Sequence, residues 1–510
     1  MGPEEHPSRC GTLLVLMLVL VGALSRRGAF SWEGIVPMLS AAVLAVALHF
    51  RDPFGRWRTD MLLSGFVIAS LAAGIYLKAG WYEQTVEYKI VFGGLPIWRQ
   101  RLNGFGIAIK VLGAFAFMAG LLYLARGRRA WRWAFPFLVS VAIATRVLMP
   151  FSSPRPIIDV MVSQTLGAKG LAIQCALERD RERLIEAHAQ DRWEAWTLRD
   201  SRNVYAMRFP TPYYNERQLG PRLDAEGRPK ERAWFDHYGY PPLTVYANAL
   251  SWLLFRDVRG LWIAFDLLAG LCLYLIARRT NPGEQGRYTA QLATLGFLFM
   301  PRSLYVIEQS WTEPLLVATL GVLALYMTTK RKAGWTGLLL GLWLSSKQYA
   351  VLAFPAFVRW LGLRMRTVFI VPIAALVGLA IVLPMALWDF GAMWHDVFGF
   401  FLTSDPRPDA MSLVGMLTRW NIEMPGWLPV PLMLIAIVVL AYKMKRNLSG
   451  WCFTAASTWL VFFMLGKQAF MNYFYVIMYA LWLAFAAAPT ETGEAASPKA
   501  SGAPAGGPPP

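Results

Sequence analysis

A single acidic residue, Asp159, stands where chemistry at a membrane surface could take place. It comes shortly after the hydrophobic segment 133–150 and opens the longest polar stretch of the chain, between Phe151 and Arg259. At this position a carboxylate is expected at the depth where lipid headgroups meet water. The placement suits a reaction between a lipid-borne substrate and a second molecule at the membrane surface.

Other polar residues end or interrupt hydrophobic segments. Asp236 and His237 stand at the far end of the polar stretch, shortly before Tyr240 and two prolines. Lys347 interrupts an apolar region of about 28 residues, where a cation costs several kcal/mol unless it is paired or reaches the interface. An intramembrane lysine is therefore a candidate functional residue, although extension of the side chain to the interface alone would also explain it.

The composition indicates a chain that lies largely in lipid. Of its 510 residues 56% are hydrophobic, and they fall in blocks of roughly 15 to 22 residues. The net charge of +18 comes mainly from short loops between these blocks, which indicates membrane topology and not a nucleic-acid-binding face. The four cysteines show neither zinc-site spacing nor a disulfide framework. Membrane lipids, and no nucleic acid, are the expected partners.

The hydrophobic blocks predict about fourteen transmembrane helices. Backbone amides in hydrocarbon need internal partners, and the blocks show no alternating barrel pattern, so each block is expected to be helical. The predicted spans are 10–25, 34–50, 61–79, 104–125, 133–150, 259–278, 287–300, 312–329, 334–346, 348–362, 367–387, 427–443, 449–466 and 469–487. The expected fold class is an all-α polytopic membrane protein.

Positive charges place both termini in the cytoplasm. Arginines and lysines gather in alternate short loops, for example at 126–132, 330–332 and 443–446, which marks these loops as cytoplasmic. The long polar stretch 151–258 then lies outside. Residues 241–255 are too short for a span and would invert the charge pattern, so they are expected to form a helix in the outer interface.

The outer loop contains a second amphipathic element. Between Leu171 and Arg199, apolar and charged residues mix at helical spacing, with Glu and Arg one turn apart, which predicts a helix on the membrane surface. Residues 201–231 are rich in Pro, Gly, Asn and Tyr and are expected to form an irregular loop over a cleft.

Three regions follow from this organisation. Residues 1–132 form an N-terminal block of four predicted helices, and 133–487 form a membrane domain that carries the outer loop 151–258. The segment 10–24 has the character of a signal sequence with a poor cleavage site, and we interpret it as a first transmembrane helix. Residues 488–510 consist largely of Ala, Gly, Ser and Pro and predict a disordered cytoplasmic tail.

The order of the polar motifs resembles the GT-C fold of lipid-dependent glycosyltransferases. The motifs are Asp159 after its helix, Tyr240-Pro241-Pro242-Leu243, Asp257-Val258-Arg259, EQSWTEP at 308–314, GLWLSSKQY at 341–349, Lys467-Gln468-Ala469-Phe470 and Asn472-Tyr473. Within that fold the chain is most similar to the bacterial polyprenol-phosphate-mannose-dependent mannosyltransferases of glycosyltransferase family 87. The resemblance covers about 133–487, and the first four predicted helices fall outside it.

The resemblance implies a reaction that needs one base and one or two cations. An acceptor hydroxyl attacks the anomeric carbon of a polyprenyl-phosphate sugar, expected to be mannose, and inverts it. Asp159 is then the expected general base; as an alternative, it caps a helix that starts at Val160. Members that use a metal often carry Asp-x-Asp or Glu-x-Asp here, whereas this chain has Ile157-Ile158-Asp159, so neither a metal nor another cofactor is expected.

Substrate-binding residues are expected around the same outer face. They are Asp236, His237, Tyr240, Glu308, Lys347, Arg407 and Lys467. Lys347, with help from the loop cations, would neutralise the departing phosphate, and Tyr240 would stack on a sugar. His237 beside Asp236 could move a proton or bind the acceptor. Each of these residues has a plainer alternative as a solvated loop charge, a helix-end acid or loop packing.

A second class of function stays open, that of a lipid or solute transporter with Asp266 and Lys347 as pathway residues. The long outer loop with its surface helix favours the enzyme, because an enzyme that works on a lipid headgroup needs such a loop and a carrier does not. The expected protein is thus a hexosyltransferase of the bacterial inner (plasma) membrane. Its donor is a polyprenyl-phosphate sugar, and its acceptor is a lipid or a glycan.

Overall fold

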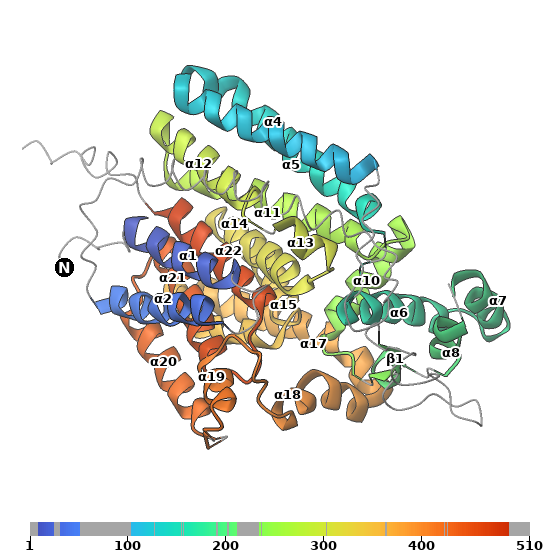
Figure 1. Ribbon diagram of the computed structural model, residues 1–510. Helices are drawn as coiled ribbons and strands as arrows, with labels where there is room; N and C mark the ends of the chain where they lie inside the picture. The colour runs from blue at the N-terminus through green and yellow to red at the C-terminus, as the bar shows by residue number, and fades with distance from the viewer. Residues whose placement is uncertain are drawn as a thin grey trace, which may run out of the picture.

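The computed structural model describes most of the chain between Arg9 and Ala488. The described ranges are 9–24, 31–50, 104–126, 128–154, 156, 158–189, 192–200, 203–211, 234–235, 237–301, 303–362, 365–422, 424–425 and 427–488. The predicted span 61–79, most of the irregular loop 201–231 and the predicted tail beyond 488 lie outside these ranges. Within them the protein is mostly helical (Figure 1).

The helices follow one another in three groups along the chain. The first group contains α1 (Arg9–Leu24), α2 (Trp32–Phe50), α4 (Gly104–Arg126) and α5 (Arg128–Ser152). The second group belongs to the stretch 151–258, the outer loop of the predicted topology, and contains α6 (Asp159–Gln174), α7 (Glu178–His188), α8 (Arg192–Asp200), the 3-10 turn η3 (Val204–Ala206) and α10 (Pro242–Phe255). In the same loop, β1 (Phe209–Pro210) pairs antiparallel with β2 (Trp234–Phe235).

The third group runs from α11 to the end of the described chain. It contains α11 (Arg259–Thr280), α12 (Gly283–Leu298), α13 (Ser303–Glu308), the π-helical turn η5 (Glu313–Val317), α14 (Ala318–Thr329), α15 (Ala333–Leu344), the 3-10 helix η6 (Gln348–Ala353), α16 (Phe354–Leu361), α17 (Met365–Trp394), the π-helical turn η7 (His395–Gly399), α18 (Phe400–Thr403), α19 (Leu413–Arg419), α20 (Pro429–Lys443), α21 (Leu448–Leu465) and α22 (Met471–Ala487).

Helices occupy every predicted span that falls within the described residues, and this part of the expectation is confirmed. Among the described residues, four helical segments are long and apolar enough to cross a membrane on their own: Trp133–Ser152, Arg259–Thr280, Thr367–Thr403 and Leu448–Leu465. The remaining apolar helices are shorter. The structure is therefore that of a mostly helical membrane protein, and the total of fourteen crossings stays a prediction.

The region around Lys347 differs from the two separate crossings that the sequence predicts. Helix α15 has 12 residues and spans about 18 Å, well below the ~30 Å of a hydrocarbon core. After Lys347 the chain forms the six-residue 3-10 helix η6 and the eight-residue α16. Pro355 in the first turn of α16 lacks an amide hydrogen, which suits the start of a new helix and not the interior of a long one. Lys347 itself lies at the turn between these short helices, as predicted.

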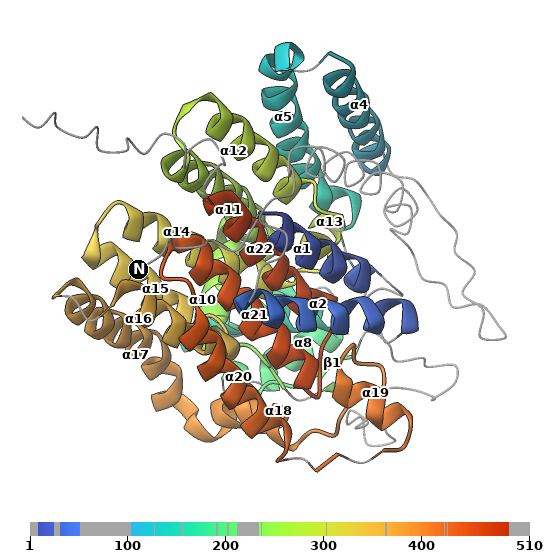
Figure 2. The ribbon, with the colours of Figure 1, turned by 90° about the vertical axis from the view of Figure 1, so that its left-hand side faces the viewer.

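The larger hydrophobic cluster is built by the long helices of the first and third groups. Helix α22 lies at its centre and packs against α1, α11, α12 and α21. Helix α2 packs against α21, so that α1 and α2 lie beside the two C-terminal helices although they are far apart from them in sequence (Figures 1 and 2). The N-terminal helices therefore share one core with the C-terminal ones.

Inside this cluster lies a closed group of polar side chains. The Arg146 guanidinium of α5 contacts an Asp266 carboxylate oxygen of α11 at 2.5 Å, and both side chains are 1% exposed. The second carboxylate oxygen accepts a hydrogen bond from the Tyr479 hydroxyl at 2.7 Å. Arg146 also donates to the Leu298 carbonyl oxygen at 2.6 Å. These contacts identify the partners of Asp266, which the sequence could not name, and satisfy its charge within the core.

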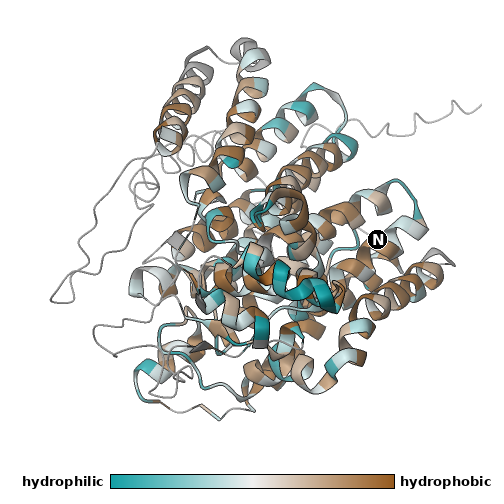
Figure 3. Ribbon diagram, turned by 90° about the vertical axis from the view of Figure 1, so that its right-hand side faces the viewer, coloured by the Kyte–Doolittle hydropathy of each residue, from teal (hydrophilic) through white to brown (hydrophobic). Residues whose placement is uncertain are grey.

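The smaller hydrophobic cluster belongs to the outer loop. It joins α6, α7, α8 and α10 to residues 238–240 and to the end of α17. From the side where α7 lies, a strongly hydrophilic helix stands in front of mostly apolar helices (Figure 3). The charged face of the outer loop is thus directed away from the core.

The prediction of one amphipathic helix over Leu171 to Arg199 is wrong. The chain forms the last turn of α6 and the separate helices α7 and α8 instead, with a break at 175–177 and the end of α7 at His188. Helix α8 returns to α6 and α7, because Glu194 pairs with Lys169 at 2.7 Å and Arg199 with Glu182 at 3.0 Å. One straight helix of this length could not bring both ends into the same small cluster.

Helix α10 confirms the helix that was predicted over 241–255. Pro242 stands in its first turn, where a missing amide hydrogen costs nothing. The helix packs mainly against α6, and Tyr238 fills the space beside Gly167 of α6. A Cβ atom at position 167 would lie 2.7 Å from the Tyr238 ring, so this close approach requires glycine.

Candidate active site

A cavity of about 660 Å³ lies between the outer loop and the third group of helices. Five of the eight site residues predicted from the sequence line it: Asp159, His237, Tyr240, Lys347 and Arg407. Glu308 and Lys467 do not line it, and Asp236 lies outside the described residues. Residues that are up to about 250 positions apart in the chain therefore meet in one space.

Asp159 is the first residue of α6 and is exposed to the cavity. Ile158 occupies the N-cap position, and one Asp159 carboxylate oxygen accepts a hydrogen bond from the Val160 amide at 2.9 Å. Asp159 is thus not the N-cap of a helix that starts at Val160, because the helix starts one residue earlier, at Asp159 itself. A carboxylate in the first turn is still favoured by the partial positive charge of the helix N-terminus.

Lys347 presents a buried cation to the same cavity. Its side chain is 4% exposed, and the ammonium donates to the Gly239 carbonyl oxygen at 3.2 Å. The Nζ atom also lies 4.3 Å from the centre of the Tyr240 ring, a cation–π contact. Lys347 is therefore held against residues 239–240 and is not extended along the protein surface, which argues against the interface-seeking alternative.

Residues 237–240 form the wall against which Lys347 packs, and three contacts fix this segment. The Tyr238 amide donates to a carboxylate oxygen of Asp396 at 2.7 Å, and the Tyr205 hydroxyl donates to the Tyr240 carbonyl oxygen at 2.9 Å. The His237 ring stacks on Phe400 of α18 with ring centres 3.9 Å apart. The position of Lys347 is thus set indirectly by η7, which contains Asp396, and by α18.

Asp396 is a site-forming residue that the sequence analysis missed. It is 1% exposed, and its second carboxylate oxygen lies 3.0 Å from the His395 Nδ1 atom. The only signal in the sequence was a carboxylate close to the end of a long apolar segment, which by itself does not distinguish a buried hydrogen-bond acceptor from a surface charge. Its partner Tyr238 is 158 positions away, beyond the reach of any local pattern.

The side chain of Tyr238 holds the wall 237–240 in place from the protein interior. Its ring is fully buried and its hydroxyl accepts a hydrogen bond from the Asn248 side-chain amide at 3.1 Å. Burial raises the pKa of the Tyr238 phenol well above its ordinary value, so the group stays neutral at every physiological pH. Because Tyr238 does not line the cavity, it serves packing and position and does not exchange a proton with a ligand there.

A strap of residues 400–411 and a turn of residues 467–473 line the opposite side. The Lys467 ammonium donates to the carbonyl oxygens of Leu402 and Ser404 at 3.0 and 3.1 Å. The Met411 amide donates to the Ala469 carbonyl oxygen at 2.7 Å. Lys467, predicted to bind substrate, thus holds the strap against the turn in this structure.

Arg407 of the strap lines the cavity but is already paired. Its guanidinium makes two hydrogen bonds to Asp409, at 3.0 and 2.8 Å, and its Cζ atom lies 4.5 Å from the centre of the Phe470 ring. The pair is about half-exposed, so it contributes little to stability. Its net charge is zero, which lowers the value of Arg407 as a phosphate ligand.

The EQSWTEP motif reaches the cavity through Trp311 and not through Glu308. Glu308 ends α13 and is buried away from the lining. Ser310 has φ +56°, a left-handed conformation that costs a non-glycine residue about 1 kcal/mol or more, and its hydroxyl donates to the Gln164 side chain of α6 at 2.6 Å. This turn directs Trp311 to the lining and ties the motif to the helix that begins with Asp159.

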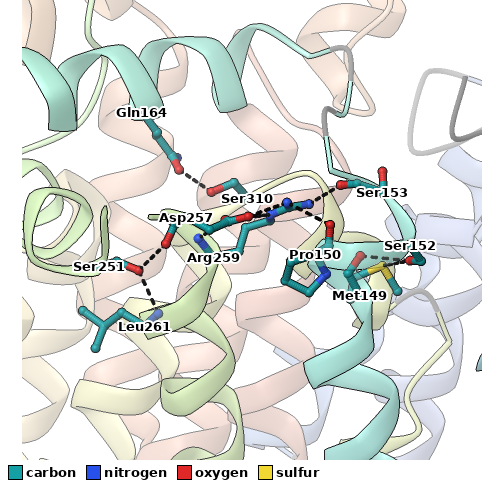
Figure 4. A network of polar contacts seen from close by, with 10 residues as sticks. All are labelled: Met149, Pro150, Ser152, Ser153, Gln164, Ser251, Asp257, Arg259, Leu261 and Ser310. Atoms are coloured by element: carbon teal, nitrogen blue, oxygen red, sulfur yellow. Dashed lines mark hydrogen bonds and ion pairs between the residues drawn. The ribbon is translucent and has the colours of Figure 1, made fainter. Parts of the chain in front are cut away.

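Asp257-Val258-Arg259 also supports the site from behind. Arg259 is fully buried, pairs with Asp257 at 2.6 Å and donates to the Ser153 carbonyl oxygen at 2.6 Å (Figure 4). Ser251 of α10 accepts from the Leu261 amide and donates to the Asp257 carbonyl oxygen. The network joins the end of α5, which precedes Asp159, to the junction of α10 and α11.

The described residues contain no group of three or more His, Cys, Asp or Glu side chains that could hold a metal ion. Metal independence stays an expectation from the sequence. Comparison of the sequence with protein-family models and with curated proteins gives no match. The chemistry of the cavity is therefore argued from its own residues: an exposed carboxylate at a helix start and a buried ammonium, within walls rich in aromatic rings.

Proposed function

We propose that the protein is a membrane glycosyltransferase that moves a sugar from a polyprenyl phosphate to an acceptor hydroxyl in this cavity. The observation that carries the proposal is that Asp159 and Lys347 line one space of about 660 Å³. The carboxylate of Asp159 can take the acceptor proton, and the ammonium of Lys347 can neutralise a leaving phosphate. Mannose is the proposed sugar because of the sequence resemblance alone.

In the proposed reaction the acceptor oxygen forms a bond to the anomeric carbon, and the bond between that carbon and the phosphate oxygen breaks. The acceptor proton passes to the Asp159 carboxylate. The electron pair of the broken bond stays on the polyprenyl phosphate, whose added negative charge is stabilised by the Lys347 ammonium. Displacement in one step inverts the anomeric carbon, in contrast with the two carboxylates of a retaining glycosidase.

Several contacts support this assignment over a transporter. In a carrier, Asp266 and Lys347 would both be pathway residues, but the Asp266 carboxylate is occupied by Arg146 and Tyr479 and lies outside the cavity lining. Only Lys347 of the two faces the cavity. The placement fits a structural ion pair plus one functional cation better than a charge relay along a pathway.

The test is Asp159→Asn in the purified full-length protein, assayed with a panel of polyprenyl-phosphate sugars. Loss of the base is expected to lower kcat by roughly 10²- to 10⁴-fold, while the affinity for donor and the melting temperature stay unchanged. Glu186→Gln, an exposed carboxylate on α7, is the matched control and should leave transfer intact. Near-normal turnover of Asp159→Asn would remove the base assignment.

A further inference from the structure

Cations and aromatic rings from three helices meet where α2, α16 and α20 end. Helix α20 packs against both α2 and α16, although the three are far apart in sequence (Figures 1 and 2). Arg359 of α16 donates to the Tyr442 carbonyl oxygen at 2.6 Å, and its Cζ atom lies 5.3 Å from the centre of the Tyr442 ring. The Lys443 ammonium lies 5.8 Å from the same ring centre and 5.4 Å from that of Phe50 on α2. One tyrosine ring therefore holds two cations from distant segments.

Further positive charge follows, without a described acid to balance it. Lys445 and Arg446 lie in the turn between α20 and α21. Among the described residues of α16, α20 and this turn none is acidic, and neither of the two cations above forms an ion pair with a described residue. In the adjoining sequence, 51–60 contains three arginines and two aspartates, and 361–366 contains two arginines. Like charges gathered in this way repel, and a bound anion would relieve the repulsion.

The arrangement of this end is fixed before any ligand binds. His49, the residue before Phe50, lies with Nδ1 2.8 Å from the Ala45 carbonyl oxygen and with Nε2 3.1 Å from the Thr454 hydroxyl of α21. Arg359 also keeps a donor in reserve, because its buried Nε atom makes no hydrogen bond with a described residue. The fork of N–H groups on a guanidinium matches the oxygens of a phosphate.

Apolar side chains lead along α2 and α20 to the same end. On α2, Val36, Val43 and Phe50 are more than half exposed and seven residues apart, which places them on one face of the helix. On α20, Ile435 and Tyr442 are also more than half exposed and seven residues apart. At 1.5 Å per residue the two faces run for roughly 21 Å and 10 Å, lengths comparable with the ~15 Å of one hydrocarbon leaflet.

We propose that this end binds a phospholipid with an anionic headgroup. Its phosphate would lie at Arg359 and Lys443, and its two chains would follow the exposed faces of α2 and α20. A zwitterionic headgroup brings its own cation into a group that is already positive, so a headgroup with net negative charge is favoured. A soluble anion would leave the apolar faces unused.

This site is separate from the cavity, because none of its residues lines the cavity. It gives a role to α2, which belongs to the N-terminal block outside the sequence resemblance. A lipid bound there would connect α2 to α16 and α20 of the membrane domain. The inference does not depend on the proposed sugar transfer.

The experiment measures lipid binding to the full-length protein in a non-ionic detergent. Native mass spectrometry counts bound dioctanoyl phosphatidylglycerol, with dioctanoyl phosphatidylcholine as the zwitterionic comparison, and thermal unfolding gives the shift in Tm. We expect the anionic lipid to bind and to raise Tm. Lys443→Gln, at an exposed position that leaves folding intact, should weaken its binding about fivefold. Arg359→Gln should weaken it at least as much.

Lys330→Gln is the matched control. Lys330 also ends an apolar helix, and its ammonium lies 5.5 Å from the centre of the Tyr326 ring, but this contact stays within one helical segment. The control should leave lipid binding unchanged, and an equal loss for Lys330→Gln and Lys443→Gln would reduce the site to general surface charge. Equal binding of phosphatidylcholine would also overturn the proposal. So would equal stabilisation by inorganic phosphate or by glycerophosphoglycerol, the same headgroup without chains, since the site would then bind a free anion.

Discussion

The two hydrophobic clusters handle buried polar groups in different ways. In the larger cluster the buried charges pair with each other. Arg146 contacts Asp266, Tyr479 donates a hydrogen bond to the Asp266 carboxylate, and the Leu298 carbonyl accepts one from Arg146. In the smaller cluster, Asp396 and Tyr205 instead form hydrogen bonds with backbone groups of Tyr238 and Tyr240. Lys347 lies at the edge of this cluster, in contact with the cavity. A closed polar group serves stability, whereas a charge left facing a cavity is available to a ligand.

The largest expected effect is in the larger cluster. Arg146→Met leaves the Asp266 carboxylate buried without its cation and should lower the free energy of unfolding by about 3–5 kcal/mol. Thermal unfolding in detergent, followed by tryptophan fluorescence, measures the change. Arg199→Met breaks the exposed pair with Glu182 and should cost no more than ~1 kcal/mol. Equal losses for the two variants would contradict the contrast between closed and exposed pairs.

The second effect separates function from stability. Lys347→Met removes the cation beside Tyr240 but keeps the length of the side chain, so we expect kcat/KM for a polyprenyl-phosphate sugar to fall by about 10²-fold. The melting temperature should fall less than for Arg146→Met. Lys330→Met, at an exposed helix end, is the control and should change neither quantity. A variant as active as the wild type would mean that Lys347 only packs.

The third effect concerns the residue that holds the wall. Asp396→Ala leaves the buried Tyr238 amide without an acceptor and should cost about 1–3 kcal/mol of stability. It should also weaken donor binding, because Gly239 and Tyr240 follow Tyr238 in the chain. Asp396→Asn keeps an acceptor oxygen and should recover most of both losses. Asp389→Asn, at the exposed kink of α17, is the comparison, and the same loss there would indicate a general effect of α17.

The smallest effect is a pH dependence of the outer loop. Burial against Trp252, with a further contribution from Arg256 and Lys169, lowers the pKa of His188 below its usual 6.5. The unfolded chain then binds a proton more readily than the folded one, so this contribution to stability is full above pH 6.5 and is lost as the pH falls through the lower folded pKa. His188→Gln should reduce the drop in melting temperature between pH 7.5 and pH 5.5. An unchanged drop would exclude His188 as its source.

The sequence predicted features that depend on local pattern. Helix α10, the turn at Lys347 and a carboxylate at the start of α6 follow from block length, proline position and polarity, and all are present. Five of the predicted residues line one cavity. Whether they carry the proposed roles is a matter for the variants above.

The features that the sequence did not give depend on contacts between distant segments. The partners of Asp266 lie 120 and 213 positions away, and that of Asp396 lies 158 positions away. Lys467 has the charge expected of a phosphate ligand, but its ammonium donates hydrogen bonds to two nearby carbonyl oxygens of the strap. The separation of α7 and α8 likewise goes with the return of α8 to α6, and the residue periodicity over 171–199 does not predict this return.

Gly167 shows how far the demands of the site extend into the scaffold. It lies on the face of α6 that receives Tyr238, and any side chain would push that ring from its place. The ring cannot move alone, because the Tyr238 amide is bound to Asp396 and its hydroxyl to Asn248. Mutational tolerance at position 167 should therefore be as low as at the cavity itself. Gly167→Ala should therefore impair function from a distance, because a displaced Tyr238 ring would shift the residues that contact Lys347.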